Sequence, residues 1–250
     1  MDRRLIVRNV HNRRVMAKLS DLISCCSDVT GVPPAAVREI SRRLREGRLI
    51  RTGTGGRYGG ADMTHDDASS LLTALLIDRT TSVSLSQIVW LTRSHLRDFR
   101  SYSVGADRLY LDTWPQKLAL PQLCRLKKGH SFGESLSALL RLIGAGELER
   151  AIAKWASLRS PGTAAYFSFD VQINASRPYS ESRISFDTAA FDLSLFYLRP
   201  QDVKQHNLVP ITAPKKWREL SEARGFDLVV TARLGHDALT AVGRLLGDAT

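Results

Sequence analysis

The sequence predicts an α+β fold, with helices through most of the chain and a small antiparallel sheet near the C-terminus. Apolar residues recur at helical spacing in successive segments up to about residue 158. After Pro161, apolar and polar residues alternate, which is the pattern of half-buried strands. A final segment returns to helical spacing, so we expect a sheet with the terminal helix packed on one face.

Two helices separated by a short break are expected at the start of the chain. Helical spacing of apolar residues predicts the first over 16–29. Thr30-Gly31-Val32 interrupts this pattern, and Pro33-Pro34 suits a first helical turn, where the missing proline N–H has no partner. The second helix, over 35–48, has an apolar face of Val37, Ile40 and Leu44. About a third of a turn away, its polar face carries Arg38, Ser41, Arg42 and Arg45.

A glycine-rich segment follows the second helix. Residues 48–52 have the pattern of a short strand, and residues 61–63 that of its returning partner. Between them, Gly53–Gly60 predicts a turn that carries Arg57 and Tyr58 at its tip. An arginine there is suited to a minor groove of DNA, and a tyrosine to a phosphate.

Residues 15–75 resemble the winged helix-turn-helix domains of bacterial and phage regulators. The segments that carry the resemblance are Thr30–Pro34, Val37–Ile50 and Gly53–Gly60, and Met63–Leu76 is similar to the segment after the wing in prophage-type proteins. The resemblance implies a domain that binds double-stranded DNA, with the glycine-rich turn as its wing. The expected fold is then an N-terminal winged helix-turn-helix, a helical middle and a C-terminal sheet with a packed terminal helix.

Basic residues gather in the same region. Residues 1–60 hold thirteen Lys and Arg against five Asp and Glu, whereas the rest of the chain holds 23 against 20. A pI of about 10.0 favours a polyanionic partner, and arginine side chains bond both guanine edges and phosphates. The alternative is an ordinary solvated helix face. The residues expected to bind DNA are Arg13, Arg14, Arg38, Ser41, Arg42, Arg45, Arg48, Arg51, Arg57 and Tyr58.

Further helices are expected in the middle of the chain. A polar cap and acidic residues in the first turn predict a helix over 64–77. Apolar spacing predicts another over 84–102, and residues 108–111 have the pattern of a short strand. A capping box of the form S-x-x-E begins a helix over 131–144, and one more helix is expected over 147–158.

Alternating residues predict the C-terminal sheet. The expected strands lie over 167–173, 184–186, 191–197 and 226–234, and the terminal helix over 236–246. An exposed edge of such a sheet can pair with its twin, and helix-turn-helix proteins commonly bind paired half-sites as dimers. We therefore expect a homodimer or higher homo-oligomer, with a monomeric core as the alternative.

Signatures of catalysis, cofactors and metals are absent from the sequence. None of the six histidines forms H-x-x-x-H or H-E-x-x-H, and there is no C-x-x-C or G-x-S-x-G. The glycine run matches neither the dinucleotide nor the P-loop pattern. We expect no enzyme, no cofactor and no bound metal. A metal-dependent nuclease stays open as a less favoured alternative, because Asp170, Asp187 and Asp192 lie on or near the predicted strands.

Cysteine usage and hydropathy bear on the compartment. The three cysteines, Cys25, Cys26 and Cys124, are odd in number and two of them are adjacent, which favours a reduced chain. No apolar run approaches the roughly 18 residues that span a bilayer. Basic residues interrupt the start of the chain, so no signal-peptide core is expected there. These observations predict a cytoplasmic protein without a membrane partner.

The chain is expected to divide into four parts. These are a basic arm over 1–14, a winged-helix domain over 15–77, a helical region over 78–160 and an α+β domain over 161–250. The function expected is a sequence-specific transcriptional regulator of a phage, prophage or mobile element. Its C-terminal part would oligomerise or engage RNA polymerase. The alternative is a multimeric phage DNA-packaging adaptor similar to a small terminase.

Overall fold

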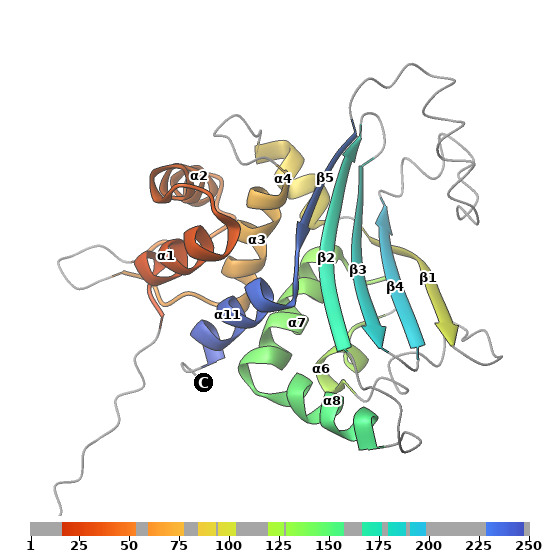
Figure 1. Cartoon of the computed structure of the whole chain (residues 1–250). Coiled ribbons are helices and arrows are strands. Elements are labelled where there is room, and N and C mark those ends of the chain that lie inside the picture. Colours follow the sequence, from red (N-terminus) through yellow and green to blue (C-terminus); the bar gives the residue numbers. More distant parts are fainter. Residues whose placement is uncertain are drawn as a thin grey trace, which may run out of the picture.

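An antiparallel sheet stands beside a group of helices in the computed structural model of the chain (Figure 1). The structure describes residues 17–53, 60–77, 85–93, 95–103, 120–127, 129–157, 167–176, 180–188, 191–198 and 229–247. Helices and an antiparallel sheet in one chain confirm the expected α+β class. No helix within these ranges is both long enough and apolar enough to cross a membrane.

The helices form largely where apolar residues recur at helical spacing. They are α1 (Leu19–Thr30), α2 (Pro34–Glu46), α3 (His65–Ile77), α4 (Leu85–Thr92), α6 (Pro121–Cys124), α7 (Phe132–Gly144), α8 (Glu147–Ser157) and α11 (His236–Gly247). The capping box at the start of α7 is confirmed, since Glu134 N–H donates to Ser131 Oγ and Ser131 N–H donates to Glu134 Oε2. The expected helices are confirmed with small shifts of their bounds, except the one over 84–102.

Within the described residues, five strands form the sheet. They are β1 (His95–Ser103), β2 (Phe167–Ser176), β3 (Ser180–Thr188), β4 (Phe191–Leu198) and β5 (Val229–Leu234). Their order is β1-β4-β3-β2-β5, and every neighbouring pair is antiparallel. The four strands expected after Pro161 are confirmed, although the start of the last one lies outside the described residues.

The helix expected over 84–102 is wrong in its second half. The helix ends at Thr92, and β1 begins at His95. Leu96 pairs with Tyr197 and Phe99 with Leu195, and an irregularity in register lies between these two pairs. A bulge inserts one extra residue into a strand. Leu96 and Phe99 are three positions apart in β1, yet their partners Tyr197 and Leu195 are two positions apart in β4. The bulge therefore gives a strand the apolar spacing of a helix.

The hairpin expected around the glycine-rich turn also differs. Residues 48–53 form a turn and irregular chain rather than a strand. Asp62 instead forms an isolated antiparallel bridge with Lys18, and Met63 N–H donates to the Ala17 carbonyl at 2.9 Å. The wing tip at 54–59, the expected strand at 108–111 and the arm at 1–14 lie outside the described residues.

The core lies between the sheet and the helices. Helix α7 is buried along most of its length, and the sheet presents Val171, Ile184, Phe186, Leu195 and Tyr197 as buried residues. One cluster of buried apolar residues extends from Ala17 to Leu246. Helix α11 packs against both α7 and α1 (Figure 1). Buried contacts thus cross the boundaries expected between domains, and the division itself stays a prediction.

Glycines allow α7 and α11 to approach closely. A Cβ added at Gly243 would lie 2.6 Å from Ile143 Cγ2, and one added at Gly144 would lie 2.7 Å from the Gly243 carbonyl oxygen. Real Cβ atoms essentially never come so near to other heavy atoms. The terminal helix α11 can therefore pack this close to α7 only because both helices have glycine at the contact.

Candidate nucleic-acid interface

A tight turn joins α1 to α2. Three residues separate the two helices, and the first of them, Gly31, has a left-handed φ of 69°. The Gly31 N–H donates to the Ser27 carbonyl at 2.9 Å, and Ser27 Oγ donates to the Val32 carbonyl at 2.7 Å. Val32 itself is buried. These contacts hold α2 at a fixed angle to α1, in the arrangement of two helices joined by a short glycine-containing turn.

Helix α2 has one buried and one exposed face. Val37, Ile40 and Leu44 are buried, and the helix packs on α1 and α3. In Figure 1, α2 lies at the edge of the helical group, on the side away from the sheet. The face opposite the apolar residues is therefore turned outward from the molecule.

The placement of Ser41 beside the arginines is wrong. Ser41 is fully buried, and its hydroxyl donates to the Val37 carbonyl at 2.8 Å. Four residues advance a helix by slightly more than one turn, so Ser41 shares the inner face with Val37. A serine hydroxyl in this position is satisfied by the helix backbone. Ser41 is not available to a partner of the outer face.

Two carboxylates hold Arg42. Its Nε donates to Glu39 Oε2 at 2.8 Å, a terminal nitrogen donates to Glu39 Oε1 at 2.6 Å, and the other pairs with Glu46. The hydrogen bond from Arg42 lowers the pKa of the Glu39 carboxyl, and the same bond raises the pKa of Arg42. Arg42 lies on the exposed face as expected, but its charge is balanced within the helix.

Arg38, Arg45 and Arg48 have no such carboxylate partners in the part of the chain that the structure describes. Arg38 and Arg48 are exposed, whereas Arg45 is half-buried. Among the described residues, none of the three forms an ion pair. The Nε of Arg45 is buried and has no hydrogen-bond partner there. Within the described residues, these three arginines therefore carry positive charge that no carboxylate balances.

Arg51 is engaged with α3. Its Nε donates to Asp67 Oδ2 at 3.0 Å, its backbone N–H donates to Asp67 Oδ1 at 3.0 Å, and its guanidinium also bonds the Asp62 carbonyl. Asp67 is almost fully buried and accepts two further hydrogen bonds from Thr64. Burial raises the pKa of Asp67, but the backbone and side-chain hydrogen bonds from Arg51 and Thr64 outweigh it, so the net shift is downward. Arg51 thus fixes the chain after α2.

Lys18 was missed by the sequence analysis. Its Nζ donates to the Gly60 carbonyl at 3.1 Å and pairs with the Asp62 carboxylate. These contacts hold the end of the glycine-rich segment against the residue that precedes α1. No local sequence pattern predicts the contact between Lys18 and Asp62, because the two residues are 44 positions apart in the sequence.

The remaining expected DNA-binding residues are Arg13, Arg14, Arg57 and Tyr58. All four lie outside the described residues, so their roles stay predictions.

The strand aspartates occupy neighbouring register positions. Asp187 pairs directly with Asp192, and Asp170 pairs with Ser185, two positions before Asp187. The structure describes the backbone pairing of these aspartates but not their side chains. Among the described residues, no group of three or more His, Cys, Asp or Glu side chains is placed to hold a metal ion.

Two buried histidines belong to the packing between elements. His130 Nε2 lies 3.1 Å from the Tyr197 hydroxyl, and His130 Nδ1 lies 3.1 Å from the Lys127 carbonyl oxygen. Burial raises the pKa of Tyr197. His65 is buried at the start of α3, and burial followed by the charge of Arg141 lowers its pKa. Both histidines lie inside the protein rather than on a surface that a substrate reaches.

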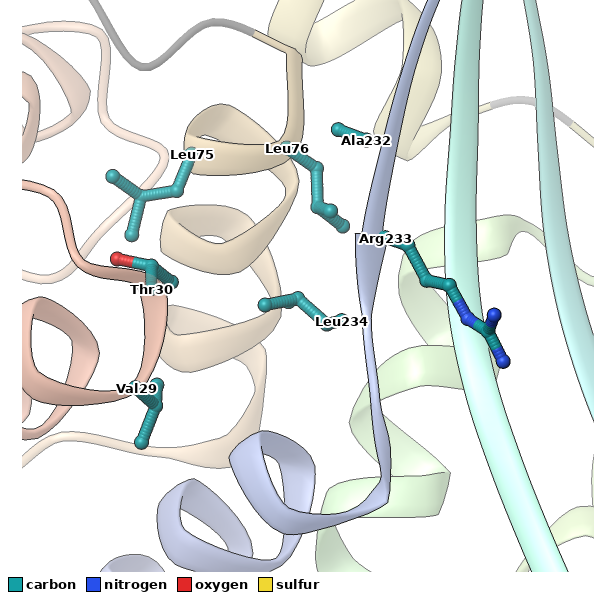
Figure 2. A pocket seen from close by; sticks show the side chains of 7 residues that line it. All are labelled: Val29, Thr30, Leu75, Leu76, Ala232, Arg233 and Leu234. Carbon is teal, nitrogen blue, oxygen red and sulfur yellow. The ribbon is translucent and has the colours of Figure 1, made fainter.

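A small pocket lies where α1, α3 and β5 meet. It has a volume of about 50 Å³. Leu75 extends from α3 toward α1, Leu76 extends from α3 toward β5, and Leu234 extends from β5 toward α3 (Figure 2). The Arg233 side chain points away from the pocket, across β2 (Figure 2). Sites for small organic ligands usually measure about 300–1,000 Å³, so this space is a packing gap between elements.

Comparison with known proteins adds no relative. A scan of protein-family models finds no match to the chain, and searches of curated proteins and of solved structures find none either. The function is therefore inferred from α2 and its surroundings.

Proposed function

We propose that the protein is a sequence-specific DNA-binding transcriptional regulator of the kind found in phages, prophages and mobile elements. A winged helix-turn-helix at its N-terminus would bind double-stranded DNA. The observation that carries this proposal is the outer face of α2. Arg38, Arg45 and Arg48 lie along the helix and at its end without carboxylate partners among the described residues, while the opposite face packs on α1 and α3.

The geometry fits insertion of α2 into a major groove. The major groove is about 12 Å wide and admits an α-helix, and α2 lies at the edge of the helical group on the side away from the sheet (Figure 1). In helix-turn-helix proteins the second helix enters the groove while the first crosses the backbone. Here α2 would be the helix that enters the groove, and α1, joined to it by the three-residue turn, would be the helix that crosses the backbone.

The glycine-rich segment would act beside α2. Lys18 and Arg51 each bond a backbone carbonyl at its returning end, Gly60 for Lys18 and Asp62 for Arg51. A segment held in this way is suited to present Arg57 and Tyr58 to the minor groove or to phosphates. Arg13 and Arg14 would contact the backbone from the N-terminal arm.

Self-association would complete the regulator. Strand β1 is an edge of the sheet as described, and pairing of this edge with its twin would place two copies of α2 about a two-fold axis. Paired half-sites would then be bound by a homodimer. RNA polymerase is a further partner proposed for the C-terminal part.

Alanine substitution tests the proposal. Arg38→Ala and Arg45→Ala should each weaken binding to a specific site by about 1–3 kcal/mol if these side chains read bases. Arg150→Ala is the matched control, because Arg150 is an exposed arginine on α8, far from α2. Binding is measured by fluorescence anisotropy with duplexes from the region around the protein's own gene, first located by footprinting.

The outcomes separate the candidate functions. A uniform loss across sequences with a shallower salt dependence indicates contacts to phosphate alone. Unchanged affinity in both α2 variants contradicts DNA binding through α2. The mass in solution distinguishes a dimeric regulator from a packaging adaptor, which would form a large ring.

A further inference from the structure

Arg48 has a backbone conformation that an arginine rarely adopts. Its φ is 58°, and it is the one non-glycine residue with a positive φ in the described part of the chain. Side chains with a Cβ are disfavoured in this left-handed region, whereas glycine enters it freely. Gly47, one position earlier, has an ordinary φ of −77°. Gly47 therefore lies one residue before Arg48, the position whose backbone conformation favours glycine.

The hydrogen bonds at the end of α2 require this conformation. Leu49 N–H donates to the Leu44 carbonyl at 2.8 Å, and Arg48 N–H donates to the Arg45 carbonyl at 3.0 Å. Together these bonds form a Schellman motif, in which the left-handed residue is usually glycine. Replacement of Arg48 by glycine should therefore stabilise the fold.

No contact within the described residues accounts for the arginine. The Arg48 side chain is exposed and makes no hydrogen bond or ion pair there. A cation near a helix C-terminus gains a modest, screened attraction to the helix dipole. Any residue with a positive charge, or asparagine with its tolerance of the left-handed region, would serve the turn equally well or better.

The position of Arg48 is fixed on both sides. Before it, Leu44 is fully buried and anchors the end of α2 to the core. After it, Ile50 is buried and Arg51 is bonded to Asp67. The exposed side chain of Arg48 therefore starts from a fixed point, two residues after the last residue of α2.

We propose that Arg48 is a fixed contact to a DNA backbone phosphate at the C-terminal end of α2, kept there although glycine would make the fold more stable. The inference rests on the proposed function. Recognition helices contact base edges chiefly with their N-terminal residues, so a residue beyond the C-terminus of α2 is placed for the phosphate backbone. A guanidinium binds phosphate oxygens through parallel hydrogen bonds.

Three variants of the full chain test this inference. Arg48→Gly and Arg48→Asn should raise the midpoint of thermal unfolding and weaken binding to duplexes of any sequence by a similar factor. The slope of log affinity against log salt should become shallower by about 1, as expected for one lost phosphate contact. Arg48→Lys keeps the charge and should retain most of the affinity. Binding is measured with a labelled duplex of mixed sequence at several salt concentrations.

Arg38→Ala separates the two ways of failing. If Arg48→Gly binds like the wild type while Arg38→Ala binds more weakly, the phosphate role of Arg48 is overturned and the proposed function stands. If neither variant changes the affinity, binding of DNA by α2 fails as well. If Arg48→Gly lowers the unfolding midpoint, the arginine stabilises the turn and the inference is overturned.

Discussion

The Arg51 guanidinium and the Asp67 carboxylate connect the chain after α2 to the first turn of α3. Arg51 Nε donates to Asp67 Oδ2 at 3.0 Å, and the Arg51 backbone N–H donates to Oδ1 at the same distance. Asp67 also accepts the backbone N–H and hydroxyl of Thr64, each at 2.8 Å. One carboxylate therefore caps α3 and fixes the exit from α2.

Removal of that carboxylate should destabilise the fold. Asp67→Ala is expected to lower the free energy of unfolding by about 2–3 kcal/mol, because the variant loses a helix cap and charged hydrogen bonds at a buried site. Arg51→Ala should have a smaller effect, since its side chain is 53% exposed and Thr64 still bonds Asp67. Urea unfolding measures both values. Equal effects of the two variants would contradict the central role of the carboxylate.

Acid should remove the contribution of Asp67. Its pKa in the folded protein lies below the unfolded value, which is about 3.9. The stabilisation is therefore fully present above the unfolded pKa and is lost as the pH falls through the folded pKa. In urea unfolding at a series of pH values, the difference between wild type and Asp67→Asn should shrink as the pH falls below about 4. A difference that does not depend on pH would show that the charge of Asp67 is not involved.

Glu39 and Glu46 should limit the affinity of α2 for DNA. Both carboxylates bond Arg42 on the exposed side of the helix. The double variant Glu39→Gln, Glu46→Gln would release Arg42 and remove two negative charges, so binding to duplexes of mixed sequence should strengthen at low salt and gain less at high salt. The double variant Glu147→Gln, Glu149→Gln in the first turn of α8 removes the same number of charges and is the control. Anisotropy titrations that show the same gain in both would indicate an effect of net charge alone.

The helices and most strands can be predicted from the sequence because each buries a regular stripe of apolar residues. Val37, Ile40 and Leu44 on α2 are such a stripe, and all three are buried. Strand β1 cannot be predicted in this way. Its irregularity between Leu96 and Asp98 gives its apolar residues a helical spacing, and only the pairing with β4 reveals the strand.

The candidate site can be predicted from the sequence only in part. Helical spacing correctly separates Arg38 and Arg42 from the apolar face of α2, but it misplaces Ser41, which turns inward. Arg51 is engaged by Asp67, which is 16 residues away in sequence and lies on α3. Whether a charge is free or compensated depends on such distant partners.

The close approach of α7 and α11 supplies the last prediction. A Cβ at position 243 would lie 2.6 Å and 2.7 Å from Cγ2 and Cβ of Ile143, both near the helix backbone and unable to move aside easily. Gly243→Ala should therefore lower the free energy of unfolding by about 1–3 kcal/mol, as overpacked cores do. Because α11 also packs on α1, the change should reach the N-terminal helices.

Gly235→Ala is the matched control for this prediction. It lies just before α11, and an added Cβ there meets no atom within 4 Å. Gly235 is the N-cap of α11, since its carbonyl accepts the Leu239 N–H, and alanine is a poorer cap than glycine. The control should therefore lower the free energy of unfolding by less than about 1 kcal/mol. Hydrogen exchange of α1 amides, compared between the two variants, should show faster exchange only in Gly243→Ala. Equal stability of the two variants would mean that α7 and α11 can move apart to admit the added methyl group without a loss of stability. It would also mean that α11 does not hold α1 in place.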